Sequence, residues 1–146
     1  MIYTIGFTKK TAQHFFELLI CNNIDIVLDI RLNNTSQLAG FAKYPDIKYF
    51  VEELLKAKYI HDVNFAPTEQ IFKDYKNKKI SWTQYVSQFE ELMKNRSIDD
   101  YIKSKYFDYK NNNICLLCSE ETSEKCHRSL IAKHFAKHVD SKITDM

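Results

Sequence analysis

Apolar and polar positions along the chain predict strands that alternate with helices. Residues 24–30 form a nearly continuous apolar run, which is typical of a strand buried on both faces of a parallel sheet. Shorter runs of β-favouring residues occur at 2–5, 59–63 and 114–118. Apolar residues at helical spacing predict helices over residues 8–22, 45–55, 67–76, 81–93, 98–104 and 125–138. Thr8 is the expected N-cap of the first helix, and Ser81 with Gln84 fits a capping box.

This alternation predicts an α/β fold with a mostly parallel sheet flanked by helices. Residues 68–104 carry only helical patterns, so we expect a helical insertion in the middle of the chain, beside the sheet. Residues 140–146 are expected to fray. The chain of 146 residues has no repeat, low-complexity tract or linker, which predicts a single domain over residues 1–146.

Composition narrows the possible environments and partners. The formal net charge of +2 does not require a nucleic-acid or membrane partner. Lysines between Lys73 and Lys79 could touch nucleic acid, but a solvated turn is the favoured interpretation. No apolar run approaches the roughly 18 residues of a membrane helix, and the N-terminus does not resemble a signal peptide. We therefore expect a cytoplasmic protein whose four cysteines are reduced, with no membrane partner. No cofactor is predicted, and the oligomeric state stays open.

Polar residues with chemical potential follow the predicted strands. Because the carboxyl ends of parallel strands meet at one edge, we expect these residues to lie close together. His61 and the stretch 6–8 belong to the same edge. The candidate site residues at this edge are Asp29, Arg31, Cys118, Glu120, Cys126, His127 and Arg128.

The start of the last helix is a candidate anion pocket. Its first N–H groups are unpaired and the helix dipole is positive there, while Arg31 and Arg128 add charge, so a phosphate or carboxylate would suit it. A helix N-terminus and a cation also lower a thiol pKa, which makes Cys126 the candidate reactive thiol. The alternative is that Cys126 is an ordinary small residue. His127 is either a base or a packed histidine, and Glu120 either exchanges protons or orients an arginine.

The cysteines also resemble a zinc-ligand set. Cys115-x-x-Cys118 is followed by Cys126 and His127. Residues three apart in a strand point to opposite faces, however, so Cys115 and Cys118 cannot share one ion and Cys115 belongs to the core. On this ground the sequence predicts no metal site.

Several of these motifs together resemble the domain-of-unknown-function family 488. The resemblance spans nearly the whole chain and rests on Tyr-Thr-Ile-Gly at 3–6, Asp-Ile-Arg at 29–31, and Leu-Leu-Cys-Ser-Glu followed by Cys-His-Arg within 116–128. It implies a small cytosolic α/β protein of prokaryotic type and supplies no reaction. The family usually has Pro three residues after the arginine of its Asp-x-Arg motif and Ser two residues after that. This chain has Asn34 in place of the Pro and keeps the serine as Ser36. The loop is therefore less rigid than the family pattern, and Ser36 joins the candidate anion-binding residues.

Three functions remain open at this point. The first is an enzyme acting on a phosphate-bearing substrate, a nucleotide or nucleic acid, with Cys118 or Cys126 as nucleophile and Glu120 or His127 as proton carrier. Asp29, Arg31, Ser36 and Arg128 would then form the anion site. The second is a non-catalytic nucleotide- or nucleic-acid-binding module that uses the same pocket. The third is a structural or partner-binding protein in which the Cys-His-Arg turn only holds the fold together.

Overall fold

A parallel five-stranded sheet forms the centre of the structure. The structure, a computed structural model, describes residues 1–35, 39–139 and 142–146. The strands are β1 (Ile2–Gly6), β2 (Ile26–Asp29), β3 (Lys58–His61), β4 (Ile114–Cys118) and β5 (Ile143–Asp145). They lie in the order β3-β2-β4-β1-β5. Every neighbouring pair is parallel, so the carboxyl ends of these strands share one edge.

Helices cover both faces of this sheet. In the described residues they are α1 (Ala12–Cys21), α2 (Asp46–Leu54), α3 (Glu69–Lys76), α4 (Trp82–Asn95), α5 (Ile98–Lys105) and α6 (His127–Val139). Three short 3₁₀ turns accompany them, η1 (Gly40–Ala42), η2 (Val63–Phe65) and η3 (Phe107–Tyr109). Within these described ranges, no helix combines the length and the apolar character needed to cross a membrane.

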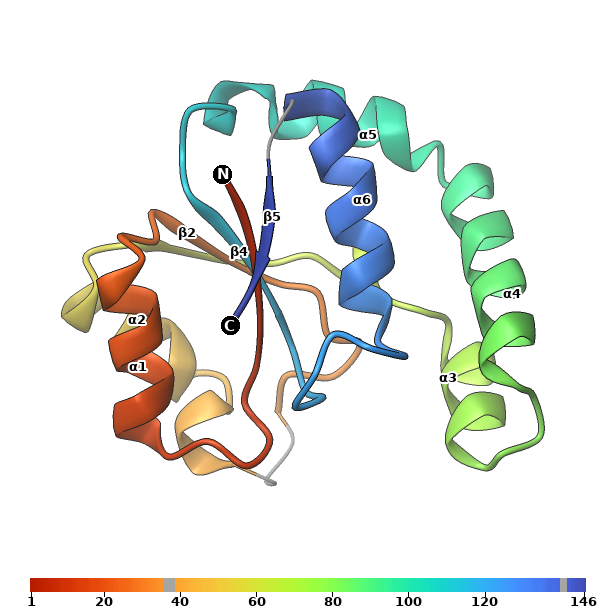
Figure 1. Cartoon of the computed structure of the whole chain (residues 1–146), viewed down its shortest axis with the longest axis horizontal. Helices are drawn as coiled ribbons and strands as arrows, with labels where there is room; N and C mark the ends of the chain where they lie inside the picture. Colours follow the sequence, from red (N-terminus) through yellow and green to blue (C-terminus); the bar gives the residue numbers. More distant parts are fainter. Residues whose placement is uncertain (36–38, 140–141) are drawn as a thin grey trace.

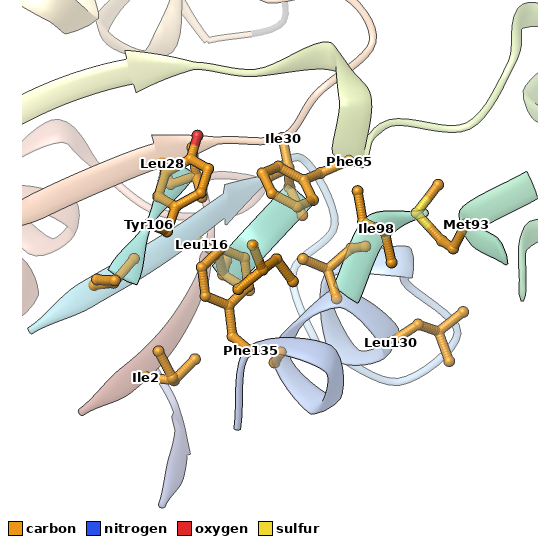
Figure 2. Close-up of a cluster of buried hydrophobic side chains, with 14 of the residues drawn as sticks. Ile2, Leu28, Ile30, Phe65, Met93, Ile98, Tyr106, Leu116, Leu130 and Phe135 are labelled. Atoms are coloured by element: carbon orange, nitrogen blue, oxygen red, sulfur yellow. The ribbon is translucent and has the colours of Figure 1, made fainter. Parts of the chain in front are cut away.

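Two hydrophobic cores lie on the two faces because successive residues of a strand point in opposite directions. Val27 and Leu117 pack with the buried faces of α1 and α2. Leu28 and Leu116 pack with α4, α5 and α6 (Figures 1 and 2). Burial on both faces explains why the sequence of β2 is a continuous apolar run rather than an alternating one.

The predicted α/β fold is confirmed, and so is the helical middle of the chain, which forms α3, α4 and α5. The capping box of Ser81 and Gln84 is also present. The helices α1 and α6 begin later than expected. Thr11, not Thr8, caps α1, and α6 begins at His127. The physical reason is local, because Lys9 and Lys125 have φ values of 59° and 53°, a left-handed conformation that a right-handed helix cannot include.

The prediction that residues 140–146 fray is wrong for the end of the chain. Residues 140 and 141 lie outside the described residues, but β5 pairs with the free edge of β1. The N–H of Met146 donates to the carbonyl of Thr4 at 2.9 Å, and the Thr4 hydroxyl donates to the Asp145 carboxylate. A three-residue strand is too short to show a hydrophobic period, so its pairing depends on the backbone groups of β1 and on Asp145.

A buried carboxylate joins the helical middle to the sheet. Asp62 follows β3 directly and is 3% exposed. It accepts hydrogen bonds from Tyr106 at 2.7 Å, Tyr101 at 2.8 Å, Lys105 at 2.9 Å and the Asn64 side chain at 2.8 Å. Burial alone would raise the pKa of Asp62, but these bonds lower it to about 2.

We expect Asp62→Asn to reduce the free energy of unfolding by about 3 kcal/mol, because it removes the charge on which these donors converge. The folded-state pKa of about 2 lies below that of an unfolded aspartate, about 3.9. The stabilisation is therefore present above about pH 4 and is lost as the pH falls toward 2. Urea unfolding from pH 2.5 to 7 measures both effects. Asp100→Asn, at an exposed position of the same helical region, is the control and should change neither.

Candidate functional site

The loop between β4 and α6 brings the predicted chemistry to the carboxyl edge of the sheet. Cys118 ends β4, and His127 begins α6. Cys118 is aligned with Gly6 of β1, and Asp29 of β2 is aligned with the preceding residue of β4. The loop leans on β1, where the N–H of Thr8 donates to the carbonyl of Ser119 at 3.1 Å. The three central strands thus place their last residues around one centre.

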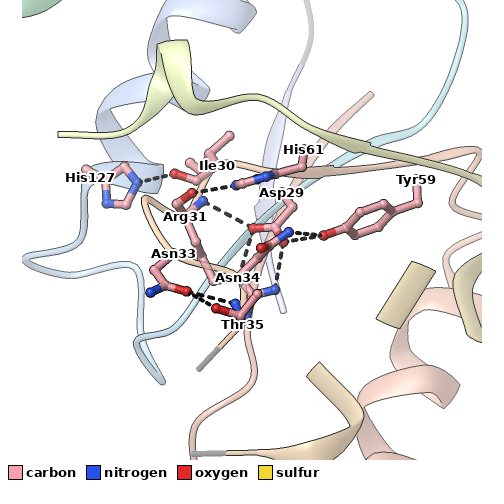
Figure 3. Close-up of polar contacts among 9 residues, drawn as sticks. All are labelled: Asp29, Ile30, Arg31, Asn33, Asn34, Thr35, Tyr59, His61 and His127. Atoms are coloured by element: carbon pink, nitrogen blue, oxygen red, sulfur yellow. Dashed lines mark hydrogen bonds and ion pairs between the residues drawn. The ribbon is translucent and has the colours of Figure 1, made fainter. Parts of the chain in front are cut away.

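A thiol faces an imidazole at this centre. The Sγ atom of Cys118 lies 3.7 Å from Nδ1 of His127. The other ring nitrogen, Nε2, lies 3.0 Å from the carbonyl oxygen of Ile30 (Figure 3). A carbonyl oxygen only accepts, so Nε2 carries a proton and Nδ1 of the neutral ring is the acceptor. His127 is therefore held in the tautomer that can take a proton from Cys118.

Cys126 adds a second thiol. The donor atoms of Cys118, Cys126 and His127 all lie within 4.8 Å of one another, and all three residues are buried. The hydrogen bond with Cys126 lowers the pKa of the Cys118 thiol, whereas burial raises it. The N–H groups of the next two residues and the charge of Arg128 lower this pKa further. The same bond, together with burial, raises the pKa of Cys126. These directions favour Cys118 as the thiolate, while the expectation that Cys126 is the reactive thiol stays a prediction.

Arg128 is fully buried and holds the loop in place. Its Nη1 donates to the carbonyl of Glu120 at 2.6 Å, and its Nη2 donates to the carbonyl of Glu121 at 3.3 Å. Nη2 also lies 3.5 Å from the carboxylate of Asp145 in β5, and Nη1 lies 3.7 Å from Sγ of Cys126. Its Nε has no hydrogen-bond partner within the described part of the chain. The guanidinium thus positions the loop and places a positive charge beside the thiols.

Glu120 takes part through its backbone. Its carbonyl accepts from Arg128, whereas the residue itself is exposed. The structure thus brings the Glu120 main chain, and not a buried carboxylate, to the thiols.

Arg31 is engaged by Asp29 on the same edge. Its Nε and Nη2 donate to the two carboxylate oxygens of Asp29 at 2.8 and 2.7 Å, and both residues are buried (Figure 3). Burial would lower the pKa of Arg31, but the hydrogen bonds and charge of Asp29 raise it. Tyr59 donates to the same carboxylate at 2.5 Å. The carbonyl of Arg31 accepts from Nε2 of His61 at 2.8 Å. This pair stiffens the segment that carries the Ile30 carbonyl.

The loop after Arg31 is only partly described. Asn34 is buried, and its side chain donates to the hydroxyl of Tyr59 at 3.2 Å. Ser36, a predicted anion-binding residue, lies outside the described residues. Sequence reasoning missed Tyr59, because the sequence of a short strand does not indicate that a hydroxyl on it will contact the Asp29 carboxylate on the neighbouring strand.

Aromatic rings of α4 form a wall beside the thiols. The ring of Phe89 lies 5.7 Å from that of His127, between centroids, and Tyr85 stacks on Phe89 at 5.8 Å. Burial and the nearby Cys118 and Cys126 raise the pKa of Tyr85. These residues appeared in the sequence only as the apolar stripe of a helix. Their proximity to the site could not be recognised, because it depends on how α4 packs against α6.

Among the described residues, one set of three donors is close enough to share a metal ion, namely Cys118, Cys126 and His127. Cys115 lies in the core on the α1 and α2 face, as its position in the strand predicts. His134 and His138 both contact the carboxylate of Asp99, at 2.9 Å each. Two surface hollows lie away from the thiols, one beside His134 and one beside Phe16 and Phe41.

Gly6 permits the close approach of the loop to β1. A Cβ atom at this position would lie 1.5 Å from the carbonyl oxygen of Glu120 and 2.9 Å from Nη1 of Arg128. No side chain fits there, because the oxygen that it would displace is the acceptor of the Arg128 guanidinium.

We expect Gly6→Ala to lower the free energy of unfolding by about 3 kcal/mol, since the backbone at Glu120 must move. Gly40→Ala is the matched control, because a Cβ there meets nothing within 4 Å. Urea unfolding of both variants measures the difference. Equal stability of the two variants would contradict the close approach.

The chain was compared with protein families, curated proteins and solved structures. No curated protein and no solved structure matches it. A family model described as a domain of unknown function, DUF488, matches residues 11–135 and so covers all the described candidate site residues. The match agrees with the resemblance seen in the strand-end motifs. The chain belongs to the DUF488 family.

Proposed function

We propose that the protein is a thiol-dependent enzyme in which Cys118 attacks a small phosphate-bearing substrate and His127 carries the proton. The observation that supports this best is the chain of contacts from the thiol of Cys118 to Nδ1 of His127 and from Nε2 to the carbonyl of Ile30. A nucleophile, a base and a group that orients the base are the three parts of an activated nucleophile. Here the orienting group is a main-chain carbonyl.

The chemistry assigned to each group is simple. Cys118 transfers its proton to Nδ1 of His127, and the resulting thiolate attacks the phosphorus atom. The bond from phosphorus to the leaving oxygen breaks, and that oxygen takes the proton from His127. Water then hydrolyses the sulfur–phosphorus bond and regenerates the thiol. The low exposure of Cys118, 5%, favours a small group over a bulky one at the sulfur.

Positive charge around the centre supports an anionic substrate. Arg128 is buried next to the thiols, and its Nε, which has no partner among the described residues, is a donor that a bound acceptor would satisfy. Burial lowers the pKa of the Lys10 ammonium, and the positive charge of the nearby Arg128 lowers it further. Arg31 adds a third cation at the edge, although Asp29 offsets its charge. We include Asp29, Arg31 and Ser36 among the residues that shape the proposed anion site. We also propose that the protein acts in the cytoplasm.

One observation favours a second candidate, a non-catalytic nucleotide- or nucleic-acid-binding module. The thiols are buried, and Arg31 and Arg128 are already hydrogen-bonded within the chain. Such a module would bind the anion without needing the thiol. Cys118→Ser separates the two functions, since it abolishes catalysis by an enzyme and leaves a binding module intact.

We expect iodoacetamide to alkylate Cys118 faster than the exposed Cys21 at pH 7, because His127 accepts the proton of the thiol. His127→Ala should slow the reaction of Cys118 at least tenfold, in line with the roughly 10²–10⁴-fold effect of a positioned base. His14→Ala, on the exposed face of α1, is the control. Mass spectrometry of the labelled peptides gives each rate. Cys118 reacting no faster than Cys21 would remove its role as nucleophile.

We expect inorganic phosphate to raise the melting temperature, and Lys10→Ala to reduce this shift by more than half. Lys9→Ala is the matched control, because the neighbouring ammonium already pairs with Glu121 at 2.8 Å on the exposed surface. Thermal-shift titrations at constant ionic strength separate specific binding from screening. An undiminished shift in Lys10→Ala would count against an anion site at this edge.

A further inference from the structure

We propose that Cys118, Cys126 and His127 form a binding site for a zinc-like divalent cation, and that metal binding masks the reactive thiol. The metal site itself stands on geometry alone. Its regulatory consequence rests on the proposed function, because masking has a meaning only where Cys118 is the nucleophile.

Donor spacing is the first argument. A tetrahedral zinc ion lies about 2.3 Å from a thiolate and about 2.0–2.1 Å from an imidazole nitrogen, which places the two donors about 3.5 Å apart. Sγ of Cys118 and Nδ1 of His127 are 3.7 Å apart. Sγ of Cys126 completes the set, with all three donor atoms within 4.8 Å of one another. Side-chain movements of up to about 1 Å would bring all three donors to one ion.

The surroundings of the donors are the second argument. Histidines that bind metals almost always donate their other N–H to a carbonyl or carboxylate, which fixes the tautomer. Nε2 of His127 does this toward Ile30 at 3.0 Å, so Nδ1 faces the thiols. The imidazole is therefore held in the form that a metal requires, with its unprotonated nitrogen toward the thiols.

Charge is the third argument. Two thiolates neutralise a divalent cation, so the bound ion adds no net charge to a buried centre. Arg128 lies 3.7 Å from Sγ of Cys126, but carbonyls of the loop and the carboxylate of Asp145 already engage its guanidinium. Three protein donors leave one tetrahedral position free, as in zinc sites that bind an exogenous ligand. The cation itself would attract an anion to that position.

Titration of the reduced, metal-free protein with Co²⁺ tests the site, since thiolate ligation gives an intense charge-transfer absorption. We expect one equivalent to saturate it and Zn²⁺ to displace it. Cys118→Ser, Cys126→Ser and His127→Ala should each weaken Co²⁺ binding at least tenfold. Cys115→Ser and Cys21→Ser, which alter the two other thiols, are the controls and should bind as the parent protein does. Circular dichroism establishes that each variant is folded.

The outcomes separate the metal site from the proposed enzyme. Absence of the thiolate band at one equivalent, or equal losses in Cys115→Ser and Cys118→Ser, would overturn the metal site. If Co²⁺ binds as expected, one equivalent of Zn²⁺ should slow alkylation of Cys118 at least tenfold, and an unchanged rate would overturn the masking. A metal-free Cys118 that reacts no faster than Cys21 would remove the enzyme and leave the metal site standing.

Discussion

The hydrogen bond from His127 to the carbonyl of Ile30 is the contact on which the candidate site depends. It joins the first residue of α6 to the residue that follows β2, two residues that are 97 positions apart in the chain. It also determines which ring nitrogen faces Cys118, and thereby whether the imidazole can accept a proton or coordinate an ion. The ion pair of Asp29 and Arg31 supports the same contact, because it stiffens the segment that carries the Ile30 carbonyl.

Two arginines at this edge have different structural tasks. Arg31 is paired with a carboxylate two residues away, so its charge is largely offset. Arg128 instead bonds mainly to carbonyl groups, which leaves its charge to act on the thiols and on Lys10. The close passage of the loop over Gly6 makes the second arrangement possible, since the Glu120 carbonyl occupies the space of a missing side chain. A glycine in β1 thus determines where the positive charge of α6 lies.

Periodicity in the sequence was sufficient to predict the sheet, the helices on its faces and the edge at which the candidates meet. It was insufficient wherever a contact depends on packing between distant elements. The strand β5 has no period of its own and depends on the edge of β1. The expectation that Cys126 lies in the first turn of the last helix assumed a helix that begins at residue 125, whereas Lys125 adopts a left-handed conformation and α6 begins at His127. Likewise, the strand period correctly separates Cys115 from Cys118, but it does not reveal that Cys118, Cys126 and His127 bring three donor atoms together without Cys115.

The two proposals describe one centre without and with a bound cation. Without a cation, the thiolate of Cys118 is stabilised by a second thiol, by two main-chain N–H groups and by Arg128. The same features that make a thiolate available for attack also make it available to a metal, since both reactions need the deprotonated sulfur. The geometry adds what an isolated thiolate lacks, namely a second sulfur and an oriented nitrogen at coordination distance. If both proposals hold, a cation that prefers sulfur and nitrogen donors competes with the substrate for Cys118, and the availability of that cation decides how much of the protein has a free nucleophile.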